Sequence, residues 1–266
     1  MANDFEGPII RVEDLVTHYG DRRILNHLNL DFPTGETMVI LGGSGTGKST
    51  LLRHILRLEH PTSGRIYVKN HDICCMSEEQ FNLVRSKMGM LFQSAALFNS
   101  MTIEDNVALP LRELTQLREP TIRIMTRIKL ELVGLNGFEN YMPAELSGGM
   151  KKRAGLARAL AMDPEILLFD EPSAGLDPIT AAGIDSLILK LKNAFHMTIV
   201  VVTHELASAF AIADRITVMD RGEVIATGTP EEVRNCRHSR VVQFLNRVPD
   251  SDQEDAQEYL RSLTGP

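Results

Sequence analysis

The residues best suited to chemistry form a glycine-rich stretch that directly follows a short apolar run, Thr37 to Leu41. The stretch ends in Lys48-Ser49 and has the spacing G-x-x-x-x-G-K-[ST]. Glycines let successive backbone N–H groups turn toward one point and hold phosphate oxygens, and the following helix adds its positive N-terminus. The spacing therefore predicts a nucleotide phosphate site rather than a plain glycine turn. This site would comprise Gly42, Gly43, Ser44, Gly45, Thr46, Gly47, Lys48, Ser49 and Thr50.

A second apolar run, Ile166 to Phe169, ends in two carboxylates, Asp170 and Glu171. Beside a phosphate site, Asp170 would share a Mg²⁺ ion with the Ser49 hydroxyl, while Lys48 would reach the β- and γ-phosphates. Glu171 would act as a base that polarises the attacking water. On their own, the two carboxylates could be solvated acids after a strand. The glycine-rich stretch upstream favours the chemical interpretation.

The elements that must position these groups alternate between short β-branched strands and helices, which is typical of an α/β core with a parallel sheet. One helix is expected from Lys48 to about Leu58, and a capping box at Ser77 to Gln80 opens another that ends near Lys87. The pattern is helical throughout from about Thr102 to Met162, so we expect an inserted helical subdomain over about 94–162. Strands are expected over 9–15, 25–32, 37–41, 65–68, 88–92, 166–169 and 198–202, with a hairpin over 216–219 and 224–226.

Length and charge narrow the classes of function. The chain has 266 residues, which suits one large domain or a domain with a subdomain, and 43% of them are hydrophobic. With 28 basic and 35 acidic side chains, the net charge is 28 − 35 = −7, which argues against broad electrostatic binding of nucleic acid. Cys74, Cys75 and Cys236 lack zinc-type spacing, and we expect free thiols in a reducing compartment.

Neither export nor membrane insertion is expected from the sequence itself. The acidic start, Met1 to Glu6, lacks the apolar stretch of a secretory signal. Runs such as Thr198 to Val202 are far shorter than the ~20 residues that span a bilayer. Any membrane role is therefore expected to come through a partner.

A short motif between the phosphate site and the acidic pair carries a family resemblance. Leu146-Ser147-Gly148-Gly149-Met150 opens a predicted helix. Alone it could be a turn or a helix cap, but in this order it resembles the signature segment of ABC ATPases, and the resemblance covers roughly Ile9 to Thr229. It implies an α/β P-loop NTPase (RecA-like) core with an antiparallel β subdomain and an inserted α-helical subdomain. Residues 1–249 would form the nucleotide-binding domain and residues 250–266 a C-terminal tail.

The resemblance also implies roles for four residues whose types alone would not reveal them. Tyr19 would stack on adenine, although a half-buried core aromatic is the alternative. Gln93 would link the γ-phosphate and Mg²⁺ to a transmembrane partner. Asp177 would lie in a loop that crosses a dimer, and His204 would sense the γ-phosphate. Taken singly, the last three could be a surface amide, a helix cap and a structural histidine.

The family arrangement implies two copies of the chain, facing each other head to tail, with ATP and Mg²⁺ at each interface. Ser147, Gly148 and Gly149 of one copy would contact the γ-phosphate held by the other. Met150 stands where most signature segments carry Gln. An integral membrane permease would contact the region around 93–106 and convert closure of the dimer into transport.

Met150, together with residues 90–98 and 105–111, more narrowly resembles the ATPases of Mla (maintenance of lipid asymmetry) phospholipid transporters. That resemblance implies phospholipid transport between bacterial inner and outer membranes and a peripheral position at the cytoplasmic face of the inner (plasma) membrane. It also implies a small cytoplasmic regulatory subunit and a lipid-binding periplasmic subunit. An importer of polar solutes such as amino acids is the alternative within transport.

The sequence disfavours two hypotheses of function outside transport. A soluble ABC ATPase of translation or DNA repair would be expected to carry two motif sets or long coiled coils, whereas this chain has one motif set and no heptad array. A nucleotide-dependent scaffold without turnover conflicts with the intact Lys48, Glu171 and His204.

The C-terminal region shows two short helical patterns. Val241, Phe244, Leu245 and Val248 have the spacing of one helical face, and Pro249 follows. We expect the tail after Pro249 to dock on the other ATPase chain or on a regulatory subunit, and a frayed, disordered end is the alternative. The second pattern consists of Ala256, Tyr259, Leu260 and Leu263.

Overall fold

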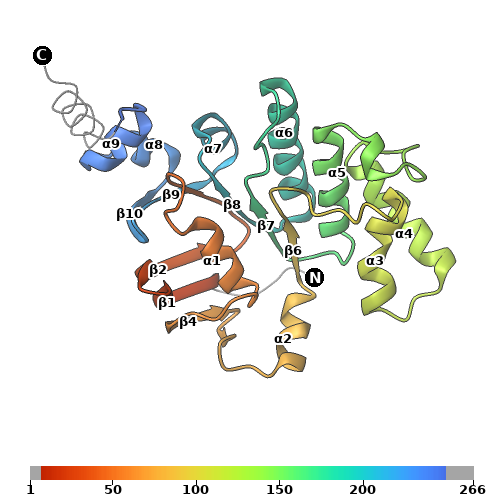
Figure 1. Ribbon diagram of the computed structural model, residues 1–266, viewed down its shortest axis with the longest axis horizontal. Coiled ribbons are helices and arrows are strands. Elements are labelled where there is room, and N and C mark those ends of the chain that lie inside the picture. Colours follow the sequence, from red (N-terminus) through yellow and green to blue (C-terminus); the bar gives the residue numbers. More distant parts are fainter. Residues whose placement is uncertain (1–6, 250–266) are drawn as a thin grey trace, which may run out of the picture.

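The computed structural model describes residues 7–249, which form two β-sheets with helices packed around them (Figure 1). The larger sheet has the order β10-β9-β3-β8-β7-β6, with five parallel strands and β10 antiparallel to β9. The smaller sheet, β2-β1-β4-β5, is antiparallel. The strands are β1 (Pro8–Tyr19), β2 (Arg22–Pro33), β3 (Thr37–Leu41), β4 (Ser63–Val68), β5 (His71–Asp72), β6 (Met88–Leu91), β7 (Ile166–Asp170), β8 (Thr198–Thr203), β9 (Arg215–Asp220) and β10 (Glu223–Gly228).

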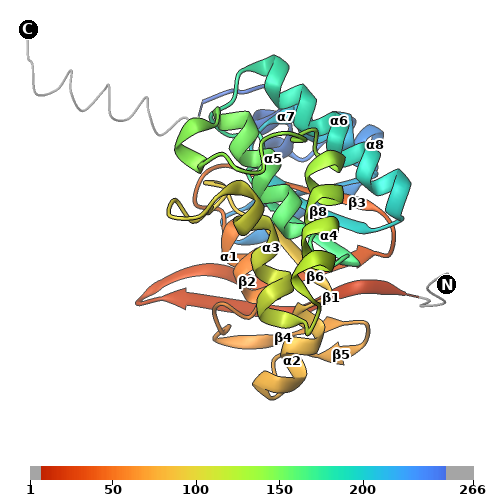
Figure 2. The ribbon, with the colours of Figure 1, turned by 90° about the vertical axis from the view of Figure 1, so that its right-hand side faces the viewer.

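Helices cover the outer face of the larger sheet and fill the space between the two sheets (Figures 1 and 2). They are α1 (Lys48–Ile55), α2 (Glu78–Arg85), α3 (Ile103–Leu114), α4 (Glu119–Leu132), η1 (Pro143–Glu145), α5 (Gly148–Ala159), α6 (Pro178–Phe195), α7 (Leu206–Ile212), α8 (Pro230–Arg234) and α9 (Ser239–Leu245). None of the helices within residues 7–249 is long and apolar enough to cross a bilayer.

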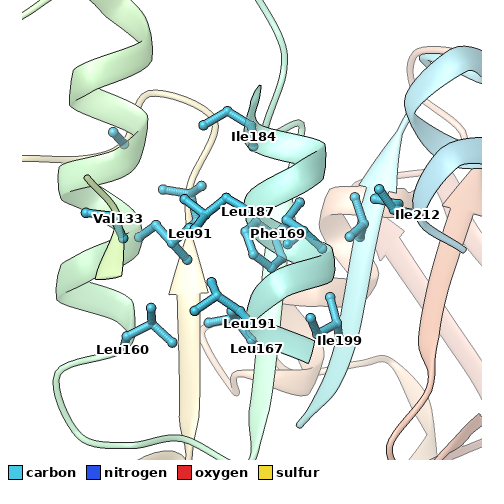
Figure 3. Packing of buried hydrophobic residues seen from close by; sticks show 14 of the residues in the cluster. Leu91, Val133, Leu160, Leu167, Phe169, Ile184, Leu187, Leu191, Ile199 and Ile212 are labelled. Carbon is cyan, nitrogen blue, oxygen red and sulfur yellow. The ribbon is translucent and has the colours of Figure 1, made fainter. Parts of the chain in front are cut away.

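The central strands of the larger sheet are apolar along their whole length because both faces of the sheet are covered. Every residue of β3 and β8 is buried, and successive side chains point to opposite faces. Leu167 and Phe169 of β7 pack against α6 residues such as Ile184 on one face (Figure 3). Leu168 enters the other core, which the sheet shares with α1 and the smaller sheet. Because the strands themselves are buried, a ligand can reach the sheet only at the loops that follow the carboxyl ends of the parallel strands.

The segment expected to be helical from Thr102 to Met162 is helical only in part. α3, α4 and α5 pack on one another (Figure 1), but residues 115–118 and 133–142 are not in helices. α3 begins where the Thr102 hydroxyl accepts the N–H of Asp105 at 3.1 Å. The buried amide of Asn106 donates to the Phe98 and Thr102 carbonyl oxygens at 3.0 and 2.9 Å, so the loop before α3 is tied to the helix.

Two helix ends differ from the expected ones for local reasons. α1 ends at Ile55 rather than near Leu58, because Arg57 adopts a left-handed backbone with φ of 50°. In the same way α9 ends at Leu245, and Arg247 has φ of 54°. Val248 is therefore 55% exposed and does not extend the predicted helical face.

The first three residues of that predicted C-terminal face do pack inward. Val241 is fully buried, and Phe244 and Leu245 contact the core on the same side of the sheet. The second predicted face, of Ala256, Tyr259, Leu260 and Leu263, lies outside the described residues.

Candidate active site

The glycine-rich stretch, residues 42–49, forms a tight loop between β3 and α1, and two of its glycines lie where a side chain would not fit. A Cβ at Gly42 would lie 2.5 Å from the Met219 carbonyl oxygen. Gly47 caps α1 with φ of 97°, and its Cβ would lie 2.5 Å from Leu25 Cδ2. Glycine supplies this positive φ at no steric cost. The loop can therefore pack this closely and leave backbone N–H groups at the helix N-terminus for an anion.

Lys48 is buried within this loop, which we call the phosphate loop. Its Nζ donates to the carbonyl oxygens of Gly42 and Gly43 at 2.8 and 2.9 Å. Burial lowers the pKa of Lys48, and the nearby carboxylates of Glu171 and Asp170 act in the opposite direction. A desolvated ammonium group held by carbonyl oxygens is well placed to exchange them for phosphate oxygens.

Ser49 and Asp170 meet although 121 positions separate them in the chain. The Ser49 Oγ donates to the Asp170 Oδ1 at 2.8 Å. A hydroxyl and a carboxylate oxygen beside a phosphate loop form the oxygen donor set that Mg²⁺ uses when phosphates and water complete its shell. These two residues therefore fit a Mg²⁺ ion bound together with a nucleotide.

Glu171 directly follows β7, and its carboxylate contacts Thr203 and His204. Its Oε2 accepts the Thr203 hydroxyl at 3.1 Å and the His204 backbone N–H at 3.4 Å. Its Oε1 lies 2.9 Å from His204 Nδ1. The backbone of Glu171 is left-handed, with φ of 49°, and such strain at a non-glycine residue gathers at functional sites.

A cleft of about 540 Å³ opens beside these groups. Gln93 and Asp170 both line it, together with Arg53 of α1 and Gly175. Gln93 is exposed and follows β6. The cleft therefore has Gln93 and the acidic end of β7 in one lining, and the role of Gln93 toward an ion stays a prediction.

The remaining predicted residues lie outside the lining of this cleft. Tyr19, at the end of β1, is 45% exposed and so is not a core residue, and its hydroxyl donates to the Glu59 carboxylate. Ser147 caps α5 by accepting the N–H of Met150 at 3.3 Å. Asp177 caps α6 by accepting the N–H groups of Ile179 and Thr180 at 3.1 and 3.0 Å.

The signature segment, residues 146–150, adjoins the start of α6 rather than the phosphate loop of its own chain. A Cβ at Gly149 would lie 2.4 Å from Thr180 Cγ2, and one at Gly148 would lie 3.4 Å from Leu176 Cδ2. Within residues 7–249, no hydrogen bond joins Ser147, Gly148 or Gly149 to residues 42–50. A single chain thus presents the phosphate loop and the signature segment as two separate surfaces.

Sequence reasoning missed two residues that contact Glu171. Thr203 ends β8 and is distant in sequence, so no local pattern indicates it. Lys152 stands in the basic run Lys151-Lys152-Arg153, which by itself indicates only a local charged patch, but its Nζ donates to the Glu171 carbonyl oxygen at 2.9 Å. It follows Gly149 by three positions and precedes Leu156 by four, so a lysine on the buried face of this helix was the available signal.

Comparison with known proteins agrees with this geometry. A family model described as ABC transporter matches residues 25–174. Over 258 residues the chain is 44% identical to the intermembrane phospholipid transport system ATP-binding protein MlaF of Haemophilus influenzae, covering 96% of this chain and 98% of that protein. Over 240 residues it is 42% identical to the probable ribonucleotide transport ATP-binding protein mkl of Mycobacterium leprae, covering 90% of this chain and 69% of that protein.

A solved structure gives the same answer for the fold. It is a dimeric post-hydrolysis state of the ATP-binding cassette MJ0796 bound to ADP and Pi, with a TM-score of 0.77 and 32% identity, covering 83% of this chain and 98% of that one. The family match spans more than half of the chain, and the fold class expected from the sequence is confirmed. The chain belongs to the ABC transporter family, as one of its ATP-binding, ATP-hydrolysing subunits.

Proposed function

We propose that this chain hydrolyses Mg²⁺-bound ATP to power phospholipid transport between bacterial inner and outer membranes, through an integral permease. The observation that carries the catalytic part is the meeting of Ser49 with Asp170, next to Glu171 and His204, at the mouth of the phosphate loop. Residues 1–249 would form the nucleotide-binding domain, with a helical part over about 94–162, and residues 250–266 the tail.

The chain's own groups would divide the chemistry among them. The backbone N–H groups of residues 42–49 and the Lys48 ammonium would hold the β- and γ-phosphates. Glu171 would accept a hydrogen bond from the attacking water. His204 would orient the Glu171 carboxylate and sense the γ-phosphate. Mg²⁺, held by Ser49 and Asp170 with Gln93 at the edge of its shell, would neutralise charge that develops on the phosphate oxygens. Tyr19 would stack on the adenine ring.

A second copy of the chain would complete each site. Ser147, Gly148 and Gly149 are not hydrogen-bonded to the phosphate loop of their own chain, and Asp177 lies at the start of α6 beside them. The related cassette of known structure is dimeric. Both observations support a head-to-tail dimer in which ATP lies between the phosphate loop of one copy and the signature segment of the other.

An apolar groove of about 470 Å³ between β6 and α3 is the surface we assign to the permease. Phe98 and Leu114 line it and are 50% and 63% exposed. Gln93 lies in the loop between β6 and Phe98, so a partner seated here would lie near the nucleotide. The chain would then be a peripheral subunit at the cytoplasmic face of the inner membrane. Other residues of the groove include Met88, Met90, Phe92, Leu109, Pro110 and Met162.

The substrate assignment depends on the relatives. The name of the Haemophilus relative refers to phospholipid transport, and this favours lipid, with a lipid-binding periplasmic subunit and a small cytoplasmic regulatory subunit as further partners. The name of the Mycobacterium relative refers to ribonucleotide transport, and this favours the second candidate, a polar solute.

The test is to purify the full-length chain with its permease and to measure both ATP turnover and bound lipid. The proposal expects phospholipid in the complex and turnover that changes when phospholipid vesicles replace detergent. A complex without lipid, whose turnover responds only to a polar solute and its receptor, would support the second candidate. No ATP turnover in either condition would contradict the catalytic part.

A further inference from the structure

Lys152 is a buried lysine that faces the active site of its own chain. It is 5% exposed, and its Nζ donates to the backbone carbonyl oxygen of Glu171 at 2.9 Å. Burial lowers the pKa of Lys152, and the carboxylates of Glu171 and Asp170 act in the opposite direction. A lysine is almost never this buried unless it is paired, so this contact is the natural reason for its place in the fold.

The carbonyl that Lys152 contacts belongs to a strained residue. Glu171 has φ of 49°, which costs free energy for any residue other than glycine. Its N–H donates to the Val202 carbonyl oxygen at 2.9 Å, and its carbonyl also accepts the N–H of Ala174 at 3.2 Å. Without Lys152, the Glu171 carbonyl oxygen would keep only the 3.2 Å hydrogen bond from the Ala174 N–H.

α5 makes a second contact of the same kind. Arg158, on the same helix, donates to the carbonyl oxygens of Ala95 and Ala96 at 3.0 and 2.8 Å. Both alanines are left-handed, with φ of 61° and 48°, and both follow Gln93 in the loop after β6. α5 therefore holds the strained backbone on both sides of the cleft.

Close packing fixes α5 against β6 and the loop after it. A Cβ at Gly155 would lie 2.8 Å from Leu91 Cδ1 and 3.1 Å from Ala95 Cβ. A Cβ at Gly89 of β6 would lie 2.4 Å from the Ala159 carbonyl oxygen. Because helix and strand touch with no room for a methyl group, a displacement of α5 has to be shared by the groups that it contacts.

We infer that Lys152 is a positioning residue that ties the orientation of α5 to the backbone of Glu171. This inference rests on the proposed function, because it takes Glu171 as the base and the start of α5 as the surface that contacts the nucleotide of a second copy. ATP bound to one copy would then set the orientation of α5 in the other copy, and Lys152 would transmit a change in that orientation to Glu171 of its own chain. The occupancy of each site would thereby affect the position of the base in the opposite site.

The test compares Lys152→Met with Lys151→Met in the full-length chain assembled with its permease. Methionine keeps the length of the side chain and removes the donor and the charge. Lys151 is the neighbour on the same helix, and its side chain makes no hydrogen bond or ion pair within residues 7–249. We expect kcat to fall roughly 10–100-fold in Lys152→Met, as for a misplaced catalytic group, with KM for ATP unchanged. Lys151→Met should behave like the wild type.

A double mutant shows whether Lys152 acts through Glu171. In a Glu171→Gln background, adding Lys152→Met should cause no further loss of residual turnover, because residues that act as a unit are not additive. Multiplicative losses, or a rise in KM with kcat unchanged, would overturn the inference. If Lys152→Met does not fold, Lys152→Gln, which keeps a donor, carries the same comparison with a smaller expected loss of kcat. Normal turnover by Glu171→Gln alone would instead contradict the proposed function.

Discussion

Both the side chain and the backbone of Glu171 accept hydrogen bonds from neighbouring residues, and these contacts bear on the ATP binding and turnover expected of a Glu171 variant. The carboxylate has hydrogen-bond donors from Thr203 and His204, and the carbonyl has a donor from Lys152. If Glu171 is the base, as proposed, such an arrangement would fix it before the substrate arrives, so little reorganisation would be needed at the moment of reaction. The same contacts would keep a glutamine of equal size in place.

The first prediction follows for Glu171→Gln. The variant should bind ATP with wild-type affinity, because the amide preserves the size of the side chain and removes only its charge, but turnover should fall by ~10²–10⁴-fold, as when a general base is lost. ATP binding and steady-state hydrolysis by the assembled transporter measure the two parts separately. Near-normal turnover would remove Glu171 from the mechanism.

A second buried acid lies away from the nucleotide. Asp185 of α6 is 8% exposed, and its Oδ1 has no hydrogen-bond partner within residues 7–249. Burial raises the pKa of Asp185, the nearby Glu205 raises it further, and a hydrogen bond with Ser208 opposes both. A raised carboxyl pKa means that the folded chain holds this proton more tightly than the unfolded chain does.

The second prediction concerns the pH dependence of stability. The contribution of Asp185 is fully present below its unfolded pKa, about 3.9, and is lost as the pH rises through the folded value. Asp185→Asn cannot ionise, so its melting temperature relative to the wild type should increase from pH 4 to pH 7. A shift of about 1 kcal/mol would move the melting temperature by roughly 2–4 °C. A difference that is constant over this range would show that Asp185 is not the titrating group.

The site could be predicted from the sequence where its residues are contiguous. Gly42 to Ser49 and Asp170-Glu171 form local motifs whose chemistry can be read directly. Thr203 and Lys152 could not be assigned in this way, because their contacts with Glu171 depend on how β8 and α5 pack beside β7. The roles of Tyr19 and Gln93 came from family resemblance alone, and they stay predictions.

At the scale of elements, the junction of α5 and α6 decides where the signature segment lies. Gly149 in α5 meets Thr180 in α6 at a spacing that leaves no room for a Cβ. Thr180 Oγ1 donates to Asp177 at 2.5 Å, so the same residue ties this contact to the loop before α6. The start of α5 and the Asp177 loop are therefore placed together.

The third prediction uses this junction. Gly149→Ala should push α5 away from α6, because the added methyl group has no room beside Thr180. The displaced signature segment should lower turnover at least about tenfold, as for a misplaced catalytic group. ATP binding by the isolated chain should persist, because the phosphate loop is elsewhere. Thr180→Ser removes the clashing Cγ2 and keeps the hydroxyl, so the double mutant should recover most of the activity. Failure of that rescue would show that the contact with Thr180 is not what excludes a side chain.

Element types followed from sequence patterns better than element ends did. The doubly buried strands β3, β7 and β8 appear where apolar β-branched runs predicted them. The ends of α1 and α9 did not, because Arg57 and Arg247 take left-handed conformations that their residue types do not favour. Tertiary contacts select such conformations, and a single sequence does not display those contacts.

At the scale of the whole molecule, three surfaces are assigned to two proposed partners. In the proposed dimer the phosphate loop and the signature segment would face a second copy, and the apolar groove beside Phe98 would face the permease. The segment from Gln93 to Asn106, which includes the first turn of α3, joins the groove to the cleft. In the proposed dimer, closure would act on the groove through this short segment.

The final prediction tests the groove with two matched phenylalanines. Phe98 lines it and is 50% exposed, while Phe195, at the end of α6, is 45% exposed and does not line it. Phe98→Asp places a charge in an apolar contact, which should weaken association with the permease at least about tenfold, as expected for a buried aromatic anchor. Phe195→Asp should leave association unchanged, and both variants should bind ATP like the wild type. Co-purification yield and permease-stimulated turnover measure the effect. Equal losses in the two variants would mean that general surface polarity, rather than the groove, governs assembly.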